Sequence, residues 1–313
     1  MSLVVAEPVI ARNAPIPTWF GIGGGAERFC VPRSVEELRR CVEIDAALRV
    51  LGDGANLLVD DDGVPELVVE LASPAFTSID MDVKSGRVMV GAGADLAKLV
   101  TESVRNGLSG LEGLGGIPAT VGGAVMMNAG GAFGEIGNSI VRVFAVGRDG
   151  RERVLEKGRD VHFTYRHSGL QGLIITGAEL LLPLGDPGTL RAKLKDVMAY
   201  KKTSQPMAEN SAGCCFKNPT LRDEVKGLRE LGVPGKRVSA GLLIDRAGCK
   251  GMRVGGASVS MRHGNFVVTD AGAKARDVIE LMGQMVARVR NAFGVTIEPE
   301  VVVWSRHEEK TPR

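Results

Sequence analysis

Apolar residues recur along this chain at two spacings, one typical of helices and one typical of strands. Spacings of three and four residues predict amphipathic helices over residues 189–202 and 275–292. Their apolar faces comprise Leu190, Leu194, Val197 and Met198 in the first helix and Val278, Leu281, Met285, Val289 and Phe293 in the second. Each helix therefore has one face that must be buried against the rest of the protein.

Terminal signals predict two more helices. Ser34 and Glu37 form a capping-box pattern before a helix over 35–43, and Gly107 follows a helix over 95–106. Short apolar runs between turn residues predict strands over 48–51, 67–71, 87–90, 140–146, 152–155, 172–182 and 295–304. Because helices and strands intermix without regular alternation, we expect an α+β fold.

Two glycine-rich segments lie between these elements. Seven of the nineteen residues 113–131 are glycine, and residues 52–59 include Gly52 and Gly54. Glycine allows a backbone to approach a ligand closely, and successive amide groups in turns can bind a diphosphate. Two such segments indicate a long phosphorylated cofactor that contacts both, although two tight β-turns in a sheet would use the same residues.

The bulk composition excludes several classes of function. A net charge of +2 on 313 residues gives no strong attraction to nucleic acid or to an anionic membrane. No apolar run reaches the roughly 18 residues of a membrane span, and residues 1–17 do not resemble a signal peptide. The five cysteines lack disulfide spacing, and the four histidines lack metal-ligand spacing. We therefore expect a cytoplasmic enzyme without a bound metal.

Three clusters of polar residues could carry chemistry. They are residues 165–168 around Arg166, residues 211–219 with Cys214, Lys217 and Asn218, and the pair Glu298 and Glu300. The arginine could clamp a carboxylate or be a surface ion-pair partner. The second cluster could present a reactive thiol or be a hairpin with a buried cysteine. The two glutamates point the same way on an extended chain, which is also typical of a solvated strand face.

Taken in order, these segments resemble the UDP-N-acetylenolpyruvoylglucosamine reductase family from about residue 13 to residue 301. The motifs that carry the resemblance are Thr-Trp-Phe-Gly-Ile-Gly-Gly at 18–24, the glycine segments 52–59 and 116–130, Tyr-Arg-His-Ser at 165–168, Gln-Pro at 205–206 with 211–219, residues 240–251, and His-Gly-Asn-Phe-Val-Val at 263–268. Ala119 replaces a glycine of the family pattern, and Cys214 replaces a serine. No tyrosine-bearing insertion is evident between Ser168 and Thr189, so the chain resembles the class without that loop.

The resemblance implies a vanillyl-alcohol-oxidase/PCMH-type FAD-binding fold in two subdomains, with a C-terminal α+β substrate domain. The first subdomain would span residues 1–78 and be completed by 299–313, the second would span 79–203, and the substrate domain 204–298. The resemblance also implies that NADPH reduces FAD, which passes hydride to C3 of the enolpyruvyl ether of UDP-N-acetylglucosamine enolpyruvate. Protonation at C2 would give UDP-N-acetylmuramate for peptidoglycan precursor synthesis.

The same resemblance assigns roles to individual residues. Arg166 and Glu300 would stabilise the substrate carboxylate, and preorganised charge of this kind is often the largest catalytic contribution. Cys214 would protonate C2, since a thiol with an ordinary pKa of about 8.5 is mostly protonated at neutral pH. The substrate would also bind Lys217 and Asn218. The FAD-binding residues would be Gly52, Asp53, Gly54, Ala55, Asn56 and Leu57 in one segment and Gly116, Ile117, Pro118, Ala119, Gly122, Gly123, Asn128, Ala129 and Gly130 in the other.

Two other functions remain open from the sequence. One is a flavin-dependent oxidase or dehydrogenase of the same fold that acts on a small hydroxy acid or sugar. Neither glycine segment holds the histidine or cysteine through which many such oxidases bond flavin covalently. The other is a catalytically inactive flavin or nucleotide-sugar binding protein, which only the serine-to-cysteine change at Cys214 supports. Bleaching of bound flavin by NADPH would separate these alternatives, and the sequence leaves the oligomeric state open.

Overall fold

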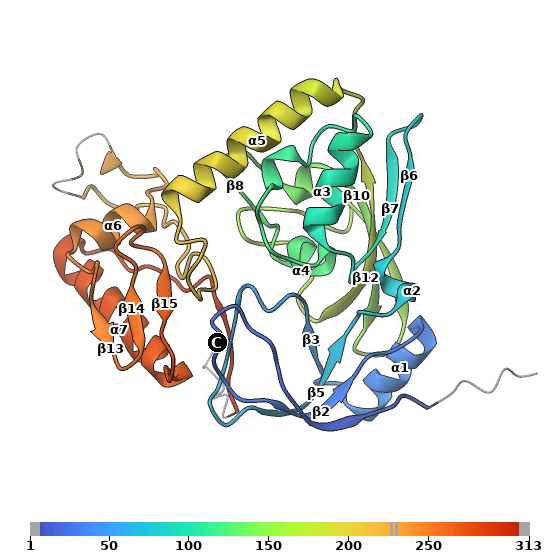
Figure 1. The fold of residues 1–313 in the computed structure, drawn as a ribbon, viewed down its shortest axis with the longest axis horizontal. Coiled ribbons are helices and arrows are strands. Elements are labelled where there is room, and N and C mark those ends of the chain that lie inside the picture. The colour runs from blue at the N-terminus through green and yellow to red at the C-terminus, as the bar shows by residue number, and fades with distance from the viewer. Residues whose placement is uncertain (1–6, 226–227, 229–230, 307–313) are drawn as a thin grey trace, which may run out of the picture. The chain divides into compact units, whose positions relative to one another are not determined.

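The computed structural model describes residues 7–225, 228 and 231–306 of the chain. The chain divides into two compact units (Figure 1). Unit 1 comprises Met1–Ala14, Ala26–Asp53 and Pro65–Lys201, and unit 2 comprises Pro15–Gly25, Gly54–Val64 and Lys202–Arg313. Each unit is therefore assembled from segments that are far apart in the sequence. The domain boundaries implied by the resemblance remain a prediction.

Unit 1 is built on two sheets, of four and five strands, and a separate two-stranded pair. Its strands are β1 (Ala11–Ala14), β2 (Ala26–Cys30), β3 (Arg49–Leu51), β5 (Val64–Glu70), β6 (Ile79–Asp82), β7 (Arg87–Gly91), β8 (Gly130–Gly131), β9 (Gly134–Glu135), β10 (Ile140–Gly147), β11 (Glu152–Glu156) and β12 (Leu173–Leu181). Its helices are α1 (Val35–Ile44), α2 (Pro74–Thr77), α3 (Leu96–Arg105), α4 (Val121–Met126) and α5 (Pro187–Ser204), with 3₁₀ helices η1 (Glu112–Leu114) and η2 (Ile136–Asn138). An antiparallel sheet has the order β11-β10-β12-β7-β6, and a mixed sheet has the order β1-β2-β5-β3.

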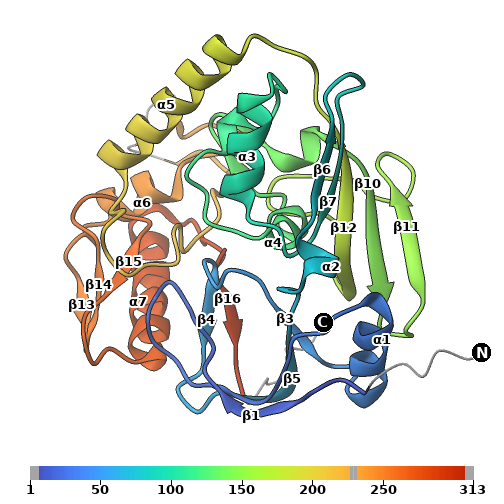
Figure 2. The ribbon, with the colours of Figure 1, turned by 45° about the vertical axis from the view of Figure 1, so that its right-hand side comes forward.

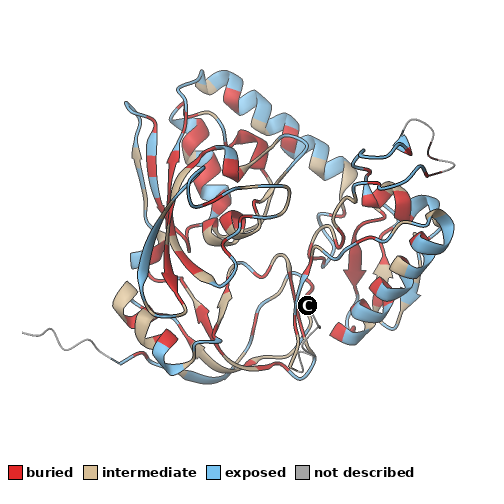
Figure 3. Ribbon diagram, turned by 180° about the vertical axis from the view of Figure 1, so that it is seen from behind, coloured by how far each residue is buried: buried red, intermediate tan, exposed pale blue. Residues whose placement is uncertain are grey.

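The core of unit 1 extends from α1 and the mixed sheet to the space between the five-stranded sheet and helices α3 and α4, which cover the same face of that sheet (Figures 1 and 2). Ile174, Ala178 and Leu180 on the central strand β12 are fully buried, as are Leu99 of α3 and Val125 of α4. Figure 3 shows buried positions along the strands of this sheet. Burying one large apolar side chain is worth roughly 1.5–3 kcal/mol, so this packing fixes α4 and the glycine segment around it.

Unit 2 packs a small sheet against two helices. Its elements are β4 (Leu57–Val59), α6 (Ala240–Arg246), β13 (Arg253–Val254), β14 (Ala257–Val259), β15 (Val267–Thr269), α7 (Ala275–Phe293) and β16 (Val302–Trp304). Strands β4 and β16 pair in parallel, with Val302 opposite Leu57. The Asp61 carboxylate accepts from the N–H of Ala275 at 2.8 Å and that of Arg276 at 3.3 Å, which stabilises the positive end of α7.

The predicted helices and the α+β class are confirmed, with two corrections of detail. The strand predicted over 295–304 covers only Val302–Trp304, because Pro299 cannot donate to a ladder and the backbone before it is irregular. Ser34 accepts from the N–H of Glu37 at 3.1 Å as predicted. The Glu37 carboxylate, however, accepts from the N–H of Arg33 at 2.8 Å, so the capping box closes one residue earlier. None of the helices in the described residues is both long and apolar enough to span a lipid bilayer.

Candidate active site

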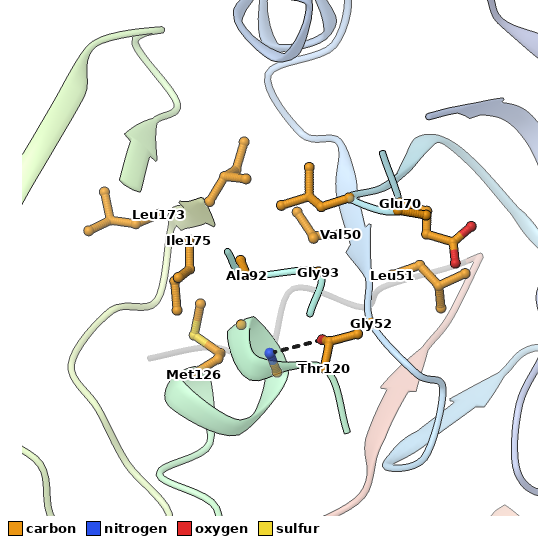
Figure 4. Close-up of a pocket in the computed structure, with 15 residues that line it drawn as sticks. Val50, Leu51, Gly52, Glu70, Ala92, Gly93, Thr120, Met126, Leu173 and Ile175 are labelled. Carbon is orange, nitrogen blue, oxygen red and sulfur yellow. Dashed lines mark hydrogen bonds between the residues drawn. The ribbon is translucent and has the colours of Figure 1, made fainter. Parts of the chain in front are cut away.

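A cavity of about 150 Å³ lies within unit 1, between β3, β12 and the start of α4 (Figure 4). Apolar side chains form much of its wall, among them Val50, Ala92, Met126, Leu173 and Ile175. The polar residues of its lining are Glu70, whose carboxyl pKa is raised by burial, and Thr120, whose hydroxyl accepts from the N–H of Gly123 at 3.3 Å. A mostly apolar cavity with few polar groups is the usual form of a site for a small organic molecule or cofactor.

Glycines allow the walls of this cavity to approach one another. A Cβ on Gly122 would lie 2.9 Å from the Cβ of Ala92, and a Cβ on Gly52 would lie 2.9 Å from the Thr120 hydroxyl. Gly52, Gly122 and Gly123, all predicted to bind FAD, line the cavity. Larger residues at Gly52 and Gly122 would force these walls apart, and the narrow apolar space between them fits a flat organic group such as part of a flavin.

The first amides of α4 are already paired within the protein. The N–H of Val121 donates to the carbonyl of Ala94 at 2.8 Å, and that of Gly122 donates to the carbonyl of Ala92 at 2.7 Å. These two amides are therefore not available for the anion-binding role that the sequence predicts for the glycine run 113–131.

The remaining predicted FAD-binding residues fall in both units. Residues 116–119 are half-buried directly before α4, and Ala129 and Gly130 follow it, all in unit 1. Asp53 is exposed at the end of a segment of unit 1, whereas Gly54, Ala55, Asn56 and Leu57 belong to unit 2. Within unit 2, the side-chain amide of Asn56 donates to the carbonyl of Glu300 at 3.1 Å.

Arg166 lies in a two-residue turn and not in a strand-like segment. The N–H of Thr164 donates to the carbonyl of His167 at 2.9 Å, and the reverse bond measures 3.0 Å, so the turn closes around Tyr165 and Arg166. Arg166 has φ of +55°, a left-handed conformation that is uncommon for a residue with a Cβ. Its guanidinium carbon lies 5.1 Å from the centroid of the Tyr165 ring. Strained conformations of this kind cluster at functional sites.

Two buried side chains attach this turn to the end of α4. Asn128 donates to the carbonyl of Thr164 at 2.9 Å and accepts from a backbone N–H at 3.0 Å. Ser168 donates to the carbonyl of Met126 at 2.7 Å. Because Met126 lines the cavity, these bonds fix the backbone of the Arg166 turn with respect to it. Asn128 was predicted to bind FAD, and its side chain has these two partners inside the protein.

In unit 2, the segment that carries Cys214 is held by a neighbouring stretch of backbone. Cys214 forms an isolated antiparallel bridge with Phe266, and the N–H of Cys215 donates to the carbonyl of Asn265 at 2.8 Å. The buried Asn265 amide accepts from the N–H of Phe216 at 3.0 Å and donates to its carbonyl at 2.8 Å. One side chain therefore fixes the backbone directly after the cysteines.

Glu300 also contacts this segment. Its N–H donates to the carbonyl of Cys215 at 2.7 Å. The side chain of Glu298, by contrast, is 76 % exposed and lies 3.9 Å from the Lys217 ammonium group. Burial, with a smaller contribution from the Glu300 carboxylate, raises the pKa of the Cys215 thiol to about 12. Cys215 is therefore a buried, protonated thiol, and the half-buried Cys214 is the better candidate for chemistry.

The predicted site residues are divided between the units. Cys214, Glu300, Lys217 and Asn218 lie in unit 2, and Arg166 lies in unit 1. Asn218 also accepts, through its side-chain oxygen, from the first N–H of α6 at 2.9 Å. Within the described residues, no group of three or more histidine, cysteine, aspartate and glutamate side chains could hold a metal ion.

Comparison with known proteins decides the family. Residues 205–304 match the model of the UDP-N-acetylenolpyruvoylglucosamine reductase C-terminal domain, and residues 26–156 match an FAD binding domain. A reductase of that name from Desulfosudis oleivorans is 40 % identical, and the match covers 91 % of this chain and 91 % of that protein. The reductase from Thermus thermophilus is 44 % identical, and the match covers 91 % of this chain and 95 % of that protein. The crystal structure of the reductase (MurB) from Thermus caldophilus aligns with a TM-score of 0.78 at 41 % identity, covering 95 % of this chain and 99 % of that one.

The chain belongs to the MurB family. Membership confirms the resemblance predicted from the sequence, the class of FAD-dependent oxidoreductases and the α+β FAD-binding fold. The assignments of enzyme class and fold are therefore supported by whole-chain similarity as well as by the motifs.

Two residues that shape the candidate site had no predicted role. Thr120 lines the cavity and caps α4. A threonine directly before a glycine-rich segment is a sequence signal for a helix N-cap at this position. Asn265 lay in the motif at 263–268, to which no role was given, although asparagine is a residue type that often hydrogen-bonds backbone groups.

Proposed function

We propose that this chain is a UDP-N-acetylenolpyruvoylglucosamine reductase that acts in the cytoplasm, with FAD and NADPH, in peptidoglycan precursor synthesis. Its substrate would be UDP-N-acetylglucosamine enolpyruvate and its product UDP-N-acetylmuramate. When bound, FAD would supply the hydride chemistry, accepting hydride from NADPH and delivering it to C3 of the enolpyruvyl ether. The reductase names of the relatives, the match to an FAD-binding domain and the glycine-walled cavity of unit 1 support this proposal.

Arg166 would stabilise the charge that forms on the substrate. Hydride addition at C3 leaves negative charge at C2, delocalised into the adjacent carboxylate. A guanidinium group stays charged at all relevant pH values and binds a carboxylate through two N–H groups. The observation that carries the proposal is the attachment of the Arg166 turn to the end of α4 through Asn128 and Ser168. A fixed backbone anchors the base of the arginine side chain, which limits the rearrangement that its guanidinium needs as charge develops.

Glu300 would be the acidic or hydrogen-bonding companion of Arg166 at the substrate carboxylate, and Cys214 would donate the proton to C2. Both contact the segment that Asn265 holds, so their backbone positions are defined in unit 2. A thiol is a stronger acid than the serine hydroxyl usual at this position, so the exchange is compatible with proton delivery. Lys217 would contribute positive charge toward the substrate, and Asn218 a side-chain amide.

An anaerobic absorbance trace of the FAD-loaded protein tests the proposal. NADPH should bleach the flavin, and UDP-N-acetylglucosamine enolpyruvate should then restore the yellow colour. The variant Cys214→Ser should restore colour at a rate close to that of the parent protein. Cys214→Ala should be slower by roughly 10²- to 10⁴-fold, the usual contribution of positioned proton transfer.

The two halves of this trace report different parts of the proposal. Bleaching needs no proton at C2, so equal bleaching rates in all three proteins control for folding and FAD content. Bleaching without recovery in the parent protein would mean a flavin reductase with another acceptor. Full-speed recovery in Cys214→Ala would remove Cys214 from the role of proton donor.

A further inference from the structure

Helix α5 contacts the glycine segment of unit 1 at two lysines. The Lys193 ammonium lies 2.7 Å from the Glu112 carboxylate, whose side chain is only 4 % exposed. About two turns further along the helix, the Lys201 ammonium donates to the carbonyl of Gly115 at 2.6 Å. Leu194 packs between these points, since a Cβ on Gly115 would lie 2.3 Å from its Cδ1. The helix therefore lies against the backbone of this segment with no space for side chains at the contact.

The Lys201 contact precedes the predicted FAD segment directly. Gly115 and Gly116 share a planar peptide bond, so the carbonyl that Lys201 holds sets the direction in which residues 116–119 leave. Gly116 has φ of +70° and can adopt this conformation without strain because it lacks a Cβ. At its far end the carbonyl of Ala119 accepts from the N–H of Leu96 at 3.0 Å. The segment is thus held at one end by α5 and at the other by α3.

Lys201 is charged in surroundings that do not favour a charge. Burial, followed by the positive charge of Arg166, lowers its pKa to about 8. The carbonyl of Gly115 compensates in part, because a hydrogen bond from a charged donor is roughly twice as strong as one between neutral groups. Lys195 on the same helix is exposed and offers a comparison without such surroundings.

We propose that Lys201 is a positioning residue for the cofactor: by holding the carbonyl of Gly115 it fixes the segment 116–119 against which FAD binds. The inference rests on the proposed function in one respect, namely that residues 116–119 contact FAD. Lys201 acts through the backbone and needs no contact with the cofactor.

Titration of the apo-protein with FAD, followed by flavin fluorescence, tests this inference. Lys201→Met keeps the aliphatic stem and removes the donor, whereas Lys201→Arg keeps a charged donor. Lys195→Met makes the same change at an exposed position of the same helix. We expect the FAD dissociation constant to rise about tenfold in Lys201→Met, near the lower end for loss of a charge-assisted hydrogen bond. It should stay near the parent value in the other two, and only Lys201→Met should change the visible circular dichroism of bound flavin.

The outcomes that would overturn the positioning role of Lys201 differ from the outcome that would count against the proposed function. Equal FAD affinity in Lys201→Met and the parent protein would overturn the positioning role. Equal losses in Lys201→Met and Lys201→Arg would also overturn it, because the charged donor would then be irrelevant. Failure of the parent protein and Lys195→Met to bind FAD would count against the proposed function instead. If far-ultraviolet circular dichroism shows Lys201→Met to be unfolded, Lys201→Gln, a shorter neutral donor, takes its place and should show weaker FAD binding than the parent.

Discussion

Arg166 and Lys201 both occupy positions that raise the free energy of the folded state. Arg166 adopts a left-handed backbone conformation, and Lys201 keeps its ammonium group in half-buried surroundings beside it. A left-handed conformation costs a residue with a Cβ roughly 1–2 kcal/mol. Such conformations persist only where the surrounding contacts impose them, and the bonds from Asn128 and Ser168 do so here. The strain therefore arises from the backbone of the turn, so its effect on stability can be measured separately from the function of the Arg166 side chain.

Substitutions of Arg166 make that separation measurable. Arg166→Ala and Arg166→Gly remove the same side chain, but glycine accepts the left-handed conformation without steric cost. We expect Arg166→Gly to have the larger free energy of unfolding, by about 1 kcal/mol, and both variants to lose flavin reoxidation by substrate while retaining FAD. Urea unfolding and the anaerobic trace measure the two effects. An alanine variant at least as stable as the glycine variant would show that the turn does not impose the conformation.

At the level of secondary-structure elements, two asparagines connect regular elements to irregular segments of the candidate site. Asn128 joins the end of α4 to the Arg166 turn in unit 1, and Asn265 joins the backbone before β15 to the Cys214 segment in unit 2. A side-chain amide carries a donor and an acceptor in one plane, so it can replace a missing pair of ladder hydrogen bonds. Both side chains are almost completely buried, which makes their loss costly.

Removal of the Asn265 amide should destabilise the protein more than removal of an exposed asparagine. Asn265→Ala leaves the N–H and carbonyl of Phe216 without their side-chain partner, which should lower the free energy of unfolding by about 3 kcal/mol. Asn291→Ala, on the exposed face of α7, should change it by less than about 0.5 kcal/mol. Urea unfolding of both variants checks the difference. A loss below about 1 kcal/mol in Asn265→Ala would mean that water replaces the amide without penalty.

The sequence predicted the regular elements of the molecule but not how its units are assembled. The helix predicted over 275–292 is found at Ala275–Phe293, because apolar periodicity and a following glycine are local signals. Unit 2, however, draws in Pro15–Gly25 and Gly54–Val64 along with its C-terminal part. The parallel pairing of β4 with β16 joins residues almost 250 positions apart. Local patterns hold no information about such pairings.

The candidate site was likewise predictable from the sequence only in part. Motif resemblance selected Arg166, Cys214 and Glu300 as candidate site residues, because each lies in a short contiguous pattern. It did not indicate that Arg166 lies in a left-handed turn, since this follows from the closure of the surrounding backbone. Nor did it indicate the inward orientation of the Asn128 side chain, because its partner Thr164 is 36 residues away. The sequence therefore indicated which residues are candidates for the chemistry, whereas the hydrogen bonds that support them depend on tertiary structure.

The acid stability of the whole molecule should depend in part on one half-buried imidazole, that of His263. The Nδ1 atom of His263 accepts from the N–H of Asn265 at 3.2 Å, so the ring must be unprotonated at that nitrogen. Burial, followed by the charge of Lys250, lowers the pKa of His263 below its ordinary value of 6.5. As pH falls through about 6.5, the unfolded state binds the proton first, and stability decreases until the folded-state pKa is reached. Glu37, whose pKa the Arg33 hydrogen bond lowers, affects stability only in more acidic solution.

As pH falls from about 7 to about 5.5, the free energy of unfolding should therefore decrease less in the His263→Gln variant than in the parent protein. Glutamine does not titrate, and its side-chain oxygen can still accept from the N–H of Asn265. Each unit by which the folded-state pKa lies below that of the unfolded chain corresponds to about 1.4 kcal/mol, which sets the scale of the difference. Urea unfolding across this range at constant ionic strength gives the two slopes, which should coincide above about pH 7.5 where both side chains are neutral. Identical slopes throughout would mean that His263 accepts a proton in the folded protein as readily as in the unfolded chain.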